Sequence, residues 1–216
     1  MQPKNEFELD SNLFTLLEIP RAWAGARERR LTAEELTKLE EAADRGYENK
    51  EAWRLLINFA IFTCCRAQEM IKAEWKHINK SGRAFNIPPE NVKTSTFRQV
   101  PLSKKSMAII ESLEKLKKED DPRVFHMFKN VQTVSKGFRR ICVRAEIDDL
   151  RFHDLRHTGI ANLFEFTELS DIEIQLITGH TNAATLKRYA QLRPSYLASK
   201  MDEVEEKRSK KTTEYA

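Results

Sequence analysis

The alternation of hydrophobic and polar residues predicts a chain made mainly of helices. The pair Thr32 and Glu35 forms the pattern of a capping box, so a helix is expected to begin there. The segment 50–63 is apolar on most sides and predicts a helix at the centre of the core. Further helices are expected at about 103–118, 131–145, 154–165, 170–179 and 182–190, with a charged helical tail at 202–211.

Three short runs rich in β-forming residues interrupt this pattern, at 75–78, 83–87 and 98–102. Glycine and proline pairs separate them, which favours a small antiparallel sheet. Lys93 falls between the last two runs, at or near a turn. The expected fold class is therefore mainly α with a small antiparallel β-sheet.

Length and composition allow one domain of good size, because the chain has 216 residues and 40% of them are hydrophobic. Lys and Arg outnumber Asp and Glu by 37 to 33, a mild basic bias that does not by itself identify a nucleic-acid partner. Three cysteines, two of them adjacent, suggest no disulfide framework. No apolar run approaches the ~18 residues of a membrane span, so we expect a soluble, cytoplasmic protein.

Arg66 closely follows the apolar segment 50–63, and Glu69 comes three residues after it. An arginine next to a buried helix is costly unless it meets a carboxylate or an anionic ligand. Taken alone, a structural ion pair between Arg66 and Glu69 is the more common explanation.

A second polar cluster lies at the predicted start of the helix 154–165. His153, Arg156 and His157 should point roughly the same way there. Arg156 offers donors suited to phosphate oxygens, and His153 has a pKa range suited to proton transfer. A surface charge cluster is one alternative. A metal pair of His153 and His157 is another, disfavoured because no cysteine lies nearby and Arg156 would repel a cation.

A third cluster joins Gly179, His180 and Tyr189 near the ends of two predicted helices. A single tyrosine says little, but the clusters together provide positive charge, a proton acceptor and a nucleophile. No acidic cluster suited to Mg²⁺ is evident, which argues against two-metal nuclease chemistry. Phosphoryl transfer without metal or cofactor, with a tyrosine nucleophile, is the chemistry that these residues favour.

These motifs resemble the tyrosine recombinase, or phage integrase, family, which includes the Xer-type recombinases and shufflon-type DNA invertases. The order and spacing agree from about Leu31 to Pro194. The matching motifs are Arg66 with Glu69, Lys93 before Val100-Pro101-Leu102, His153 to His157, Gly179-His180, and Arg188-Tyr189-Ala190. The chain departs from the family in having Cys64 where a glycine is usual, Gln68 where a serine is frequent and Thr178 in place of a leucine.

The resemblance implies a site-specific DNA recombinase that forms a 3′-phosphotyrosine at Tyr189 without metal or ATP. On this resemblance, Arg66 and Arg156 would bind the phosphate oxygens, and Lys93 would protonate the leaving 5′-oxygen. His153 would take the tyrosine proton, and His180 would form a hydrogen bond to the phosphate. Glu69 would position Arg66, with His157 in a supporting role. Rival hypotheses are a type IB topoisomerase-like nicking-closing enzyme, a non-catalytic DNA-binding protein on the same fold, and a metal-dependent hydrolase.

The resemblance also implies an organisation and partners. Residues 1–30 are expected to be a linker or the remnant of an upstream core-binding domain, because the family usually carries a domain of about a hundred residues there. Residues 31–194 would form the catalytic domain, and 195–216 a tail that packs on another protomer. We expect double-stranded DNA as partner, a homotetramer in the DNA synapse, and a prokaryotic, viral or mobile-element origin. Candidate DNA contacts are Arg27, Arg29, Arg30, Lys136, Arg139, Arg140, Arg144 and Lys187. For those between 136 and 144, a solvated helix face is an equally good explanation.

Overall fold

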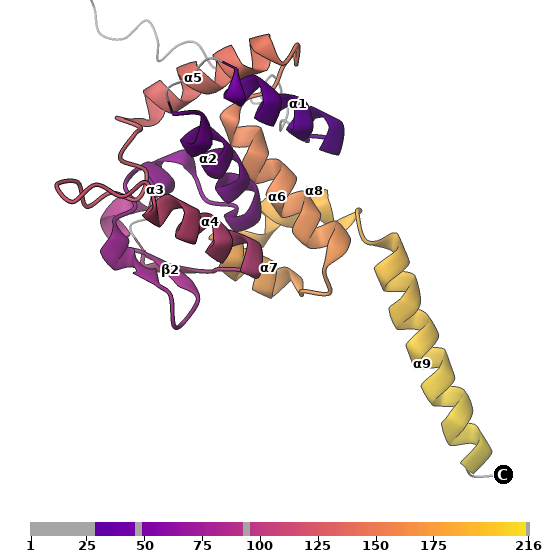
Figure 1. Cartoon of the computed structure of the whole chain (residues 1–216). Coiled ribbons are helices and arrows are strands. Elements are labelled where there is room, and N and C mark those ends of the chain that lie inside the picture. Colours follow the sequence, from indigo (N-terminus) through magenta and orange to yellow (C-terminus); the bar gives the residue numbers. More distant parts are fainter. Residues whose placement is uncertain (1–28, 46–48, 93–95, 215–216) are drawn as a thin grey trace, which may run out of the picture.

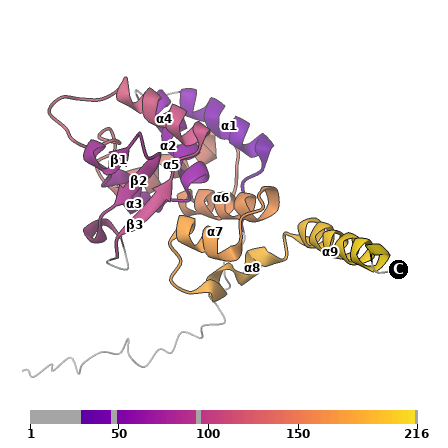
Figure 2. The same ribbon diagram turned by 90° about the horizontal axis from the view of Figure 1, so that it is seen from below.

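The fold follows the expected class: helices enclose a core, and a small antiparallel sheet lies at one end (Figures 1 and 2). The computed structural model describes residues 29–45, 49–92 and 96–214. Its α-helices are α1 (Ala33–Asp44), α2 (Lys50–Thr63), α3 (Ala67–Ile71), α4 (Lys104–Glu114), α5 (Val131–Arg144), α6 (Phe152–Phe166), α7 (Asp171–Thr178), α8 (Lys187–Ala190) and α9 (Pro194–Glu214). The strands are β1 (Ile78–Asn79), β2 (Ala84–Ile87) and β3 (Arg98–Pro101), and the 3₁₀ turns are η2 (Trp75–His77), η3 (Pro89–Asn91) and η4 (Ala183–Leu186).

Helix α2 lies at the centre, packed against α1, α4 and α6, as its apolar circumference predicts (Figure 1). Its buried Phe59 packs on Phe85 of the sheet and on Phe125. The approach of α6 to α2 is close, because a Cβ at Gly159 would lie 2.2 Å from the Ile61 carbonyl oxygen. Gly159 therefore sets the distance between the two helices.

The sheet has the order β1-β2-β3, with both pairs antiparallel. Phe85 pairs with Val100, and Ile87 pairs with Arg98. Phe85, Ile87 and Val100 are buried in the main core, so the inward face of the sheet is apolar apart from Arg98. Arg98 belongs to the polar site described below.

The structure differs from the sequence expectation in a few elements and at the ends of others. The run 75–78 is wrong as a strand: Trp75–His77 form a 3₁₀ turn, and only Ile78 reaches β1. The Nδ1 atom of His77 accepts from the Glu74 N–H at 3.1 Å, and this contact favours the turn over an extended chain. The helix expected to reach 118 ends at Glu114, and the short helix α3 was not foreseen.

A second, smaller core joins α6, α7 and α8, and Tyr189 is one of its buried members. Beyond it, Arg193 donates hydrogen bonds from Nε to the Phe164 carbonyl at 3.0 Å and from Nη2 to the Leu169 carbonyl at 2.5 Å. Helix α9 then extends away from the body in both views (Figures 1 and 2). Among the described helices, none has the length and apolar character to cross a membrane.

Candidate active site

The first element of the site is Arg66, which stands immediately before α3 and is held by Glu69. The Arg66 backbone N–H donates to the Glu69 carboxylate at 2.7 Å, and the Arg66 Nη1 donates to it at 3.0 Å. Glu69 is 1% exposed, whereas the Arg66 side chain is 25% exposed. The predicted pair therefore exists as a helix-capping arrangement, and it leaves part of the guanidinium open to an anion.

Arg98 is a site residue that the sequence did not reveal. Its Nη1 donates to both oxygens of Glu69, at 2.8 and 2.7 Å, and its Nη2 donates to the Ile177 carbonyl at 2.7 Å. Gly179 lies against it with φ of 66°, and a Cβ there would come within 2.5 Å of the Arg98 side chain. Arg98 thus ties β3 to the end of α7. The sequence signal that could have indicated Arg98 is its spacing of two residues from Val100 in a strand, since side chains two apart lie on the same face, here the inward one.

Arg156 is buried, and its guanidinium donates to main-chain carbonyls at two helix ends. Its Nη1 donates to the carbonyl of Cys64, and its Nη2 donates to that of Thr178 at 2.7 Å. Cys64 takes the left-handed conformation with φ of 52°, which explains why a glycine suits this position in the resembled family. Burial and the nearby Arg66 lower the pKa of Arg156 to about 10, so it stays charged at neutral pH. Within the described part of the chain it forms no ion pair, so its charge remains available to an anion.

His180 lies beside Arg156 just after the end of α7. Its Nε2 is 3.4 Å from the Arg156 Nη2, and its Nδ1 is 2.7 Å from the Thr178 hydroxyl. Because arginine only donates, the geometry fits a proton on Nδ1, donated to the Thr178 oxygen, while that hydroxyl donates to the Ile174 carbonyl at 2.7 Å. Burial and Arg156 lower the pKa of His180 to about 3, so the ring is neutral in the absence of an anion.

Tyr189 lies on α8, and its hydroxyl is 2.6 Å from Nδ1 of His157. The two rings are stacked with centroids 6.4 Å apart, and Phe164 stacks on Tyr189 at 5.8 Å. Burial raises the pKa of Tyr189, and the charges of Arg188 and Arg156 act in the opposite direction. The expected short helix carrying Tyr189 is therefore present, and it delivers the hydroxyl to α6.

His153 lies one helical turn before His157, and the two rings meet edge to face with centroids 5.0 Å apart. Burial and Arg156 lower the pKa of His153. The predicted common orientation of His153 and His157 is present, but the Tyr189 hydroxyl meets His157. Among the described residues, no group of three or more His, Cys, Asp and Glu side chains is arranged to hold a metal ion.

The remaining predicted residues divide into three groups. Lys93 and Arg27 lie outside the described residues. Arg29 and Arg30 form ion pairs with Glu35 and Glu165 respectively. Exposed basic side chains of the described surface include Lys136, Arg139, Arg140, Arg144 and Lys187.

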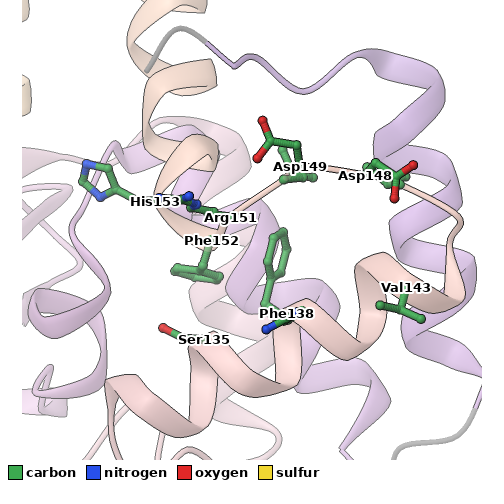
Figure 3. Close-up of a pocket in the computed structure, with 11 residues that line it drawn as sticks. Ser135, Phe138, Val143, Asp148, Asp149, Arg151, Phe152 and His153 are labelled. Carbon is green, nitrogen blue, oxygen red and sulfur yellow. The ribbon is translucent and has the colours of Figure 1, made fainter. Parts of the chain in front are cut away.

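A hollow of about 680 Å³ lies between the basic helix α5 and the start of α6. Figure 3 shows its lining: Phe138 and Phe152 lie at its centre, with Ser135 near them on α5. His153 lies at one edge of this view, and Asp148 and Asp149 lie toward the other. The hollow therefore continues from the site residue His153 toward the surface of α5, where Arg139 also lines it.

The model of the Phage integrase family matches residues 29–195, which includes every element of the site described above. The chain belongs to the phage integrase family. The five motifs quoted from the sequence lie within the matched region, and the site arrangement places four of them around Arg156.

Relatives in the phage integrase family include a shufflon-specific DNA recombinase of Escherichia coli, 32% identical over 196 residues, covering 89% of this chain and 47% of the relative. The integrase of Salmonella phage P22 is 26% identical over 162 residues, covering 69% of this chain and 42% of the relative. The chain therefore spans about half the length of these curated relatives.

Solved structures of integrase-family proteins show the same fold. XerA recombinase matches with a TM-score of 0.62 and 19% identity, over 83% of this chain and 64% of that one. The Tn1549 transposon integrase, solved with circular intermediate DNA, matches with a TM-score of 0.67 and 14% identity, over 84% of this chain and 68% of that one. The expected fold is thus confirmed by structures distant in sequence.

Proposed function

We propose that this chain is the catalytic part of a site-specific DNA recombinase that cuts and rejoins strands through a 3′-phosphotyrosine at Tyr189. The observation that carries the proposal is the contact of the buried Tyr189 hydroxyl with a histidine of α6, the helix that also carries Arg156, whose guanidinium has no ion-pair partner among the described residues. Family membership supports the same assignment. The proposed reaction needs no ATP, because the covalent link preserves the energy of the broken phosphodiester, and it needs no metal ion, because arginine side chains would stabilise the phosphate charge.

In this mechanism a DNA phosphate binds between Arg66, Arg156 and His180. The guanidinium groups balance the negative charge that grows on the non-bridging oxygens in the transition state. Arg156 is well suited to this because main-chain carbonyls fix its orientation without neutralising it. The phosphate would also raise the pKa of His180, so that its Nε2 gains a proton to donate.

The covalent step exchanges one phosphoester for another. The Tyr189 hydroxyl gives its proton to a histidine of α6 and its oxygen bonds to phosphorus. The bond to the 5′-oxygen breaks, and that oxygen leaves as a hydroxyl with a proton that we assign to Lys93. Rejoining reverses these transfers with the 5′-hydroxyl of the same or another strand. The net reaction consumes no co-reactant.

Covalent capture on randomised DNA tests this proposal whatever the target sequence is. The chain is incubated with a pool of nicked duplexes of randomised sequence, in which the cleaved fragment diffuses away and traps the adduct. Wild-type protein should give protein–DNA adducts that survive denaturing gels, and Tyr189→Phe should give none. Adducts formed equally by Tyr189→Phe, or adducts absent from the wild type across the pool, would contradict the proposal.

We also propose that the chain works as a homo-oligomer on double-stranded DNA in a prokaryotic cytoplasm, with four copies in the synapse. The support lies in α9, where Leu197, Met201 and Val204 are exposed on one face of the helix. An apolar stripe on a projecting helix favours a partner surface, and a second copy of this chain is the partner that exchange of tails would supply.

A further inference from the structure

Arg98 belongs to the site, but the proposed mechanism gives it no role. We propose that Arg98 is a positioning residue of the reaction, which holds Arg66 and His180 at the separation that a DNA phosphate requires. Arg66 lies just before α3 and His180 follows α7, and Arg98 contacts the groups that support each of them. This inference rests on the proposed function, since it concerns the phosphate site of the same reaction.

Arg98 reaches Arg66 through the Glu69 carboxylate. The Nη1 of Arg98 donates to both carboxylate oxygens, at 2.8 and 2.7 Å. Arg66 is bound to the same carboxylate by its backbone N–H at 2.7 Å and by its Nη1 at 3.0 Å. Arg98 therefore fixes the orientation of the group that anchors Arg66.

The sharing of Glu69 also determines the charge that faces a phosphate. Two guanidinium groups and one carboxylate together carry one net positive charge. The Arg98 side chain is 5% exposed, whereas that of Arg66 is 25% exposed. Because Arg98 occupies both oxygens of Glu69, the excess charge lies at Arg66, on the side that is open to an anion.

Arg98 reaches His180 through the turn that ends α7. Its Nη2 donates to the Ile177 carbonyl at 2.7 Å, and the next carbonyl, that of Thr178, accepts from the Arg156 Nη2 at 2.7 Å. A Cβ at Gly179 would lie 2.5 Å from the Arg98 Cδ, so the turn packs directly on the arginine stem. Since His180 follows this glycine, Arg98 supports the segment that places the imidazole beside Arg156.

The burial of Arg98 favours a role beyond stability. Apolar residues of similar volume often stabilise a fold as well as a buried ion pair does. In addition, the buried Nε of Arg98 has no hydrogen-bond partner in the described part of the chain, and such an unmatched N–H is costly. A buried charge with this cost is understandable if the reaction needs the two contacts that only the guanidinium makes.

Substitution by lysine separates the bridging contacts from the charge. Arg98→Lys keeps a positive charge beside Glu69, but it offers one nitrogen where the guanidinium offers two to Glu69 and Ile177. On a duplex recovered from the randomised pool, this variant should slow adduct formation by about 10²-fold at a temperature at which circular dichroism shows it folded. Arg98→Met should slow it at least as much, because it also removes the excess charge.

Arg83→Met is the matched control. Arg83, just before β2, donates to the Leu102 carbonyl just after β3, from Nε at 3.1 Å and from Nη2 at 3.0 Å. It holds the same sheet away from the site, so its loss should leave the rate at the wild-type value. If the folded Arg98 variants stay within about fivefold of the wild type, the inference is overturned while the proposed function stands. A wild type without adducts overturns both.

Nitrogen-15 NMR of the DNA-free chain, with inorganic phosphate as the probe, gives a readout that does not depend on activity. In the wild type, His180 should show one tautomer with the proton on Nδ1, as its contact with Thr178 requires. In Arg98→Lys the two tautomers should average, and phosphate should bind about tenfold more weakly because the donors to the anion are misplaced. A folded variant with the wild-type tautomer and phosphate affinity would contradict the positioning role, since a merely structural residue changes neither.

Discussion

Glu69 is a buried carboxylate that serves two arginines at once. Arg66 approaches it from the start of α3, and Arg98 approaches it from β3 with contacts of 2.8 and 2.7 Å. Arg98 also reaches the Ile177 carbonyl, so the same residue that neutralises Glu69 anchors the turn leading to His180. The position of the groups proposed to bind phosphate therefore depends on a residue that need not touch the substrate.

Removal of Arg98 should be far more costly than removal of a surface arginine. Arg98→Met leaves Glu69 buried with Arg66 as its remaining partner, and we expect a loss toward the lower end of about 3–5 kcal/mol in the free energy of unfolding. Arg45→Met, which breaks an exposed pair with Glu41, should cost less than about 0.5 kcal/mol. Urea unfolding measures both.

A second substitution makes this prediction specific to the buried charge. In the double variant Glu69→Gln with Arg98→Met, the uncompensated carboxylate is gone, so part of the lost stability should return. Strictly additive losses from the two changes would argue that Arg98 contributes through packing alone.

Sequence patterns could predict Arg66, Arg156, His180 and Tyr189 as a set, because each belongs to a short motif. They could not predict Arg98, whose partner Glu69 lies 29 residues earlier and meets it only once β3 is placed against α3. Nor could they decide which histidine meets Tyr189. His153 and His157 lie on one face of α6, and the choice depends on where α8 packs.

At the scale of elements, the contact of α2 with α6 determines the site geometry. Arg156 on α6 donates to the Cys64 carbonyl just after α2, so a change in the distance between these helices moves the guanidinium. Gly159 allows the close approach of α6 to α2, and the Leu31 N–H, just before α1, donates to the Thr158 hydroxyl oxygen of α6 at 2.8 Å.

Gly159→Ala should destabilise the protein, although a change from glycine to alanine inside a helix usually stabilises it. In an ordinary helix interior, alanine stabilises by about 1 kcal/mol over glycine. Here the new Cβ would lie 2.2 Å from the Ile61 carbonyl oxygen and 2.8 Å from the Cys64 sulfur, so the helices must separate. We expect a lower melting temperature and slower adduct formation. A raised melting temperature would show that the contact is not tight.

The helical elements were largely predictable because capping boxes and apolar periodicity are local signals. Thr32 with Glu35 and Ser170 with Glu173 cap α1 and α7 as their spacing indicates. The turn at Trp75–His77 was missed because its β-forming residues are held by a side-chain contact from His77 that periodicity does not record.

At the scale of the whole molecule, the proposed role of α9 in assembly can be tested separately from DNA cutting. Changing Leu197, Met201 and Val204 together to glutamine should remove the apolar stripe and leave Tyr189 in place. In native mass spectrometry on a captured duplex, the triple variant should show fewer copies per DNA than the wild type, with Asp202→Asn as a control on another face of the helix. Assembly equal to the wild type would contradict exchange of this tail.

The most direct test of the account is to identify the residue that carries DNA in the covalent adduct. Adducts from the randomised nicked pool are digested with nuclease and protease, and the peptide bearing the residual nucleotide is sequenced by mass spectrometry. The chain has four tyrosines, Tyr47, Tyr189, Tyr196 and Tyr215, so the result is decisive. The account predicts a nucleotide 3′-phosphate on Tyr189, and a nucleotide on another residue, or one joined through its 5′-phosphate, would contradict it.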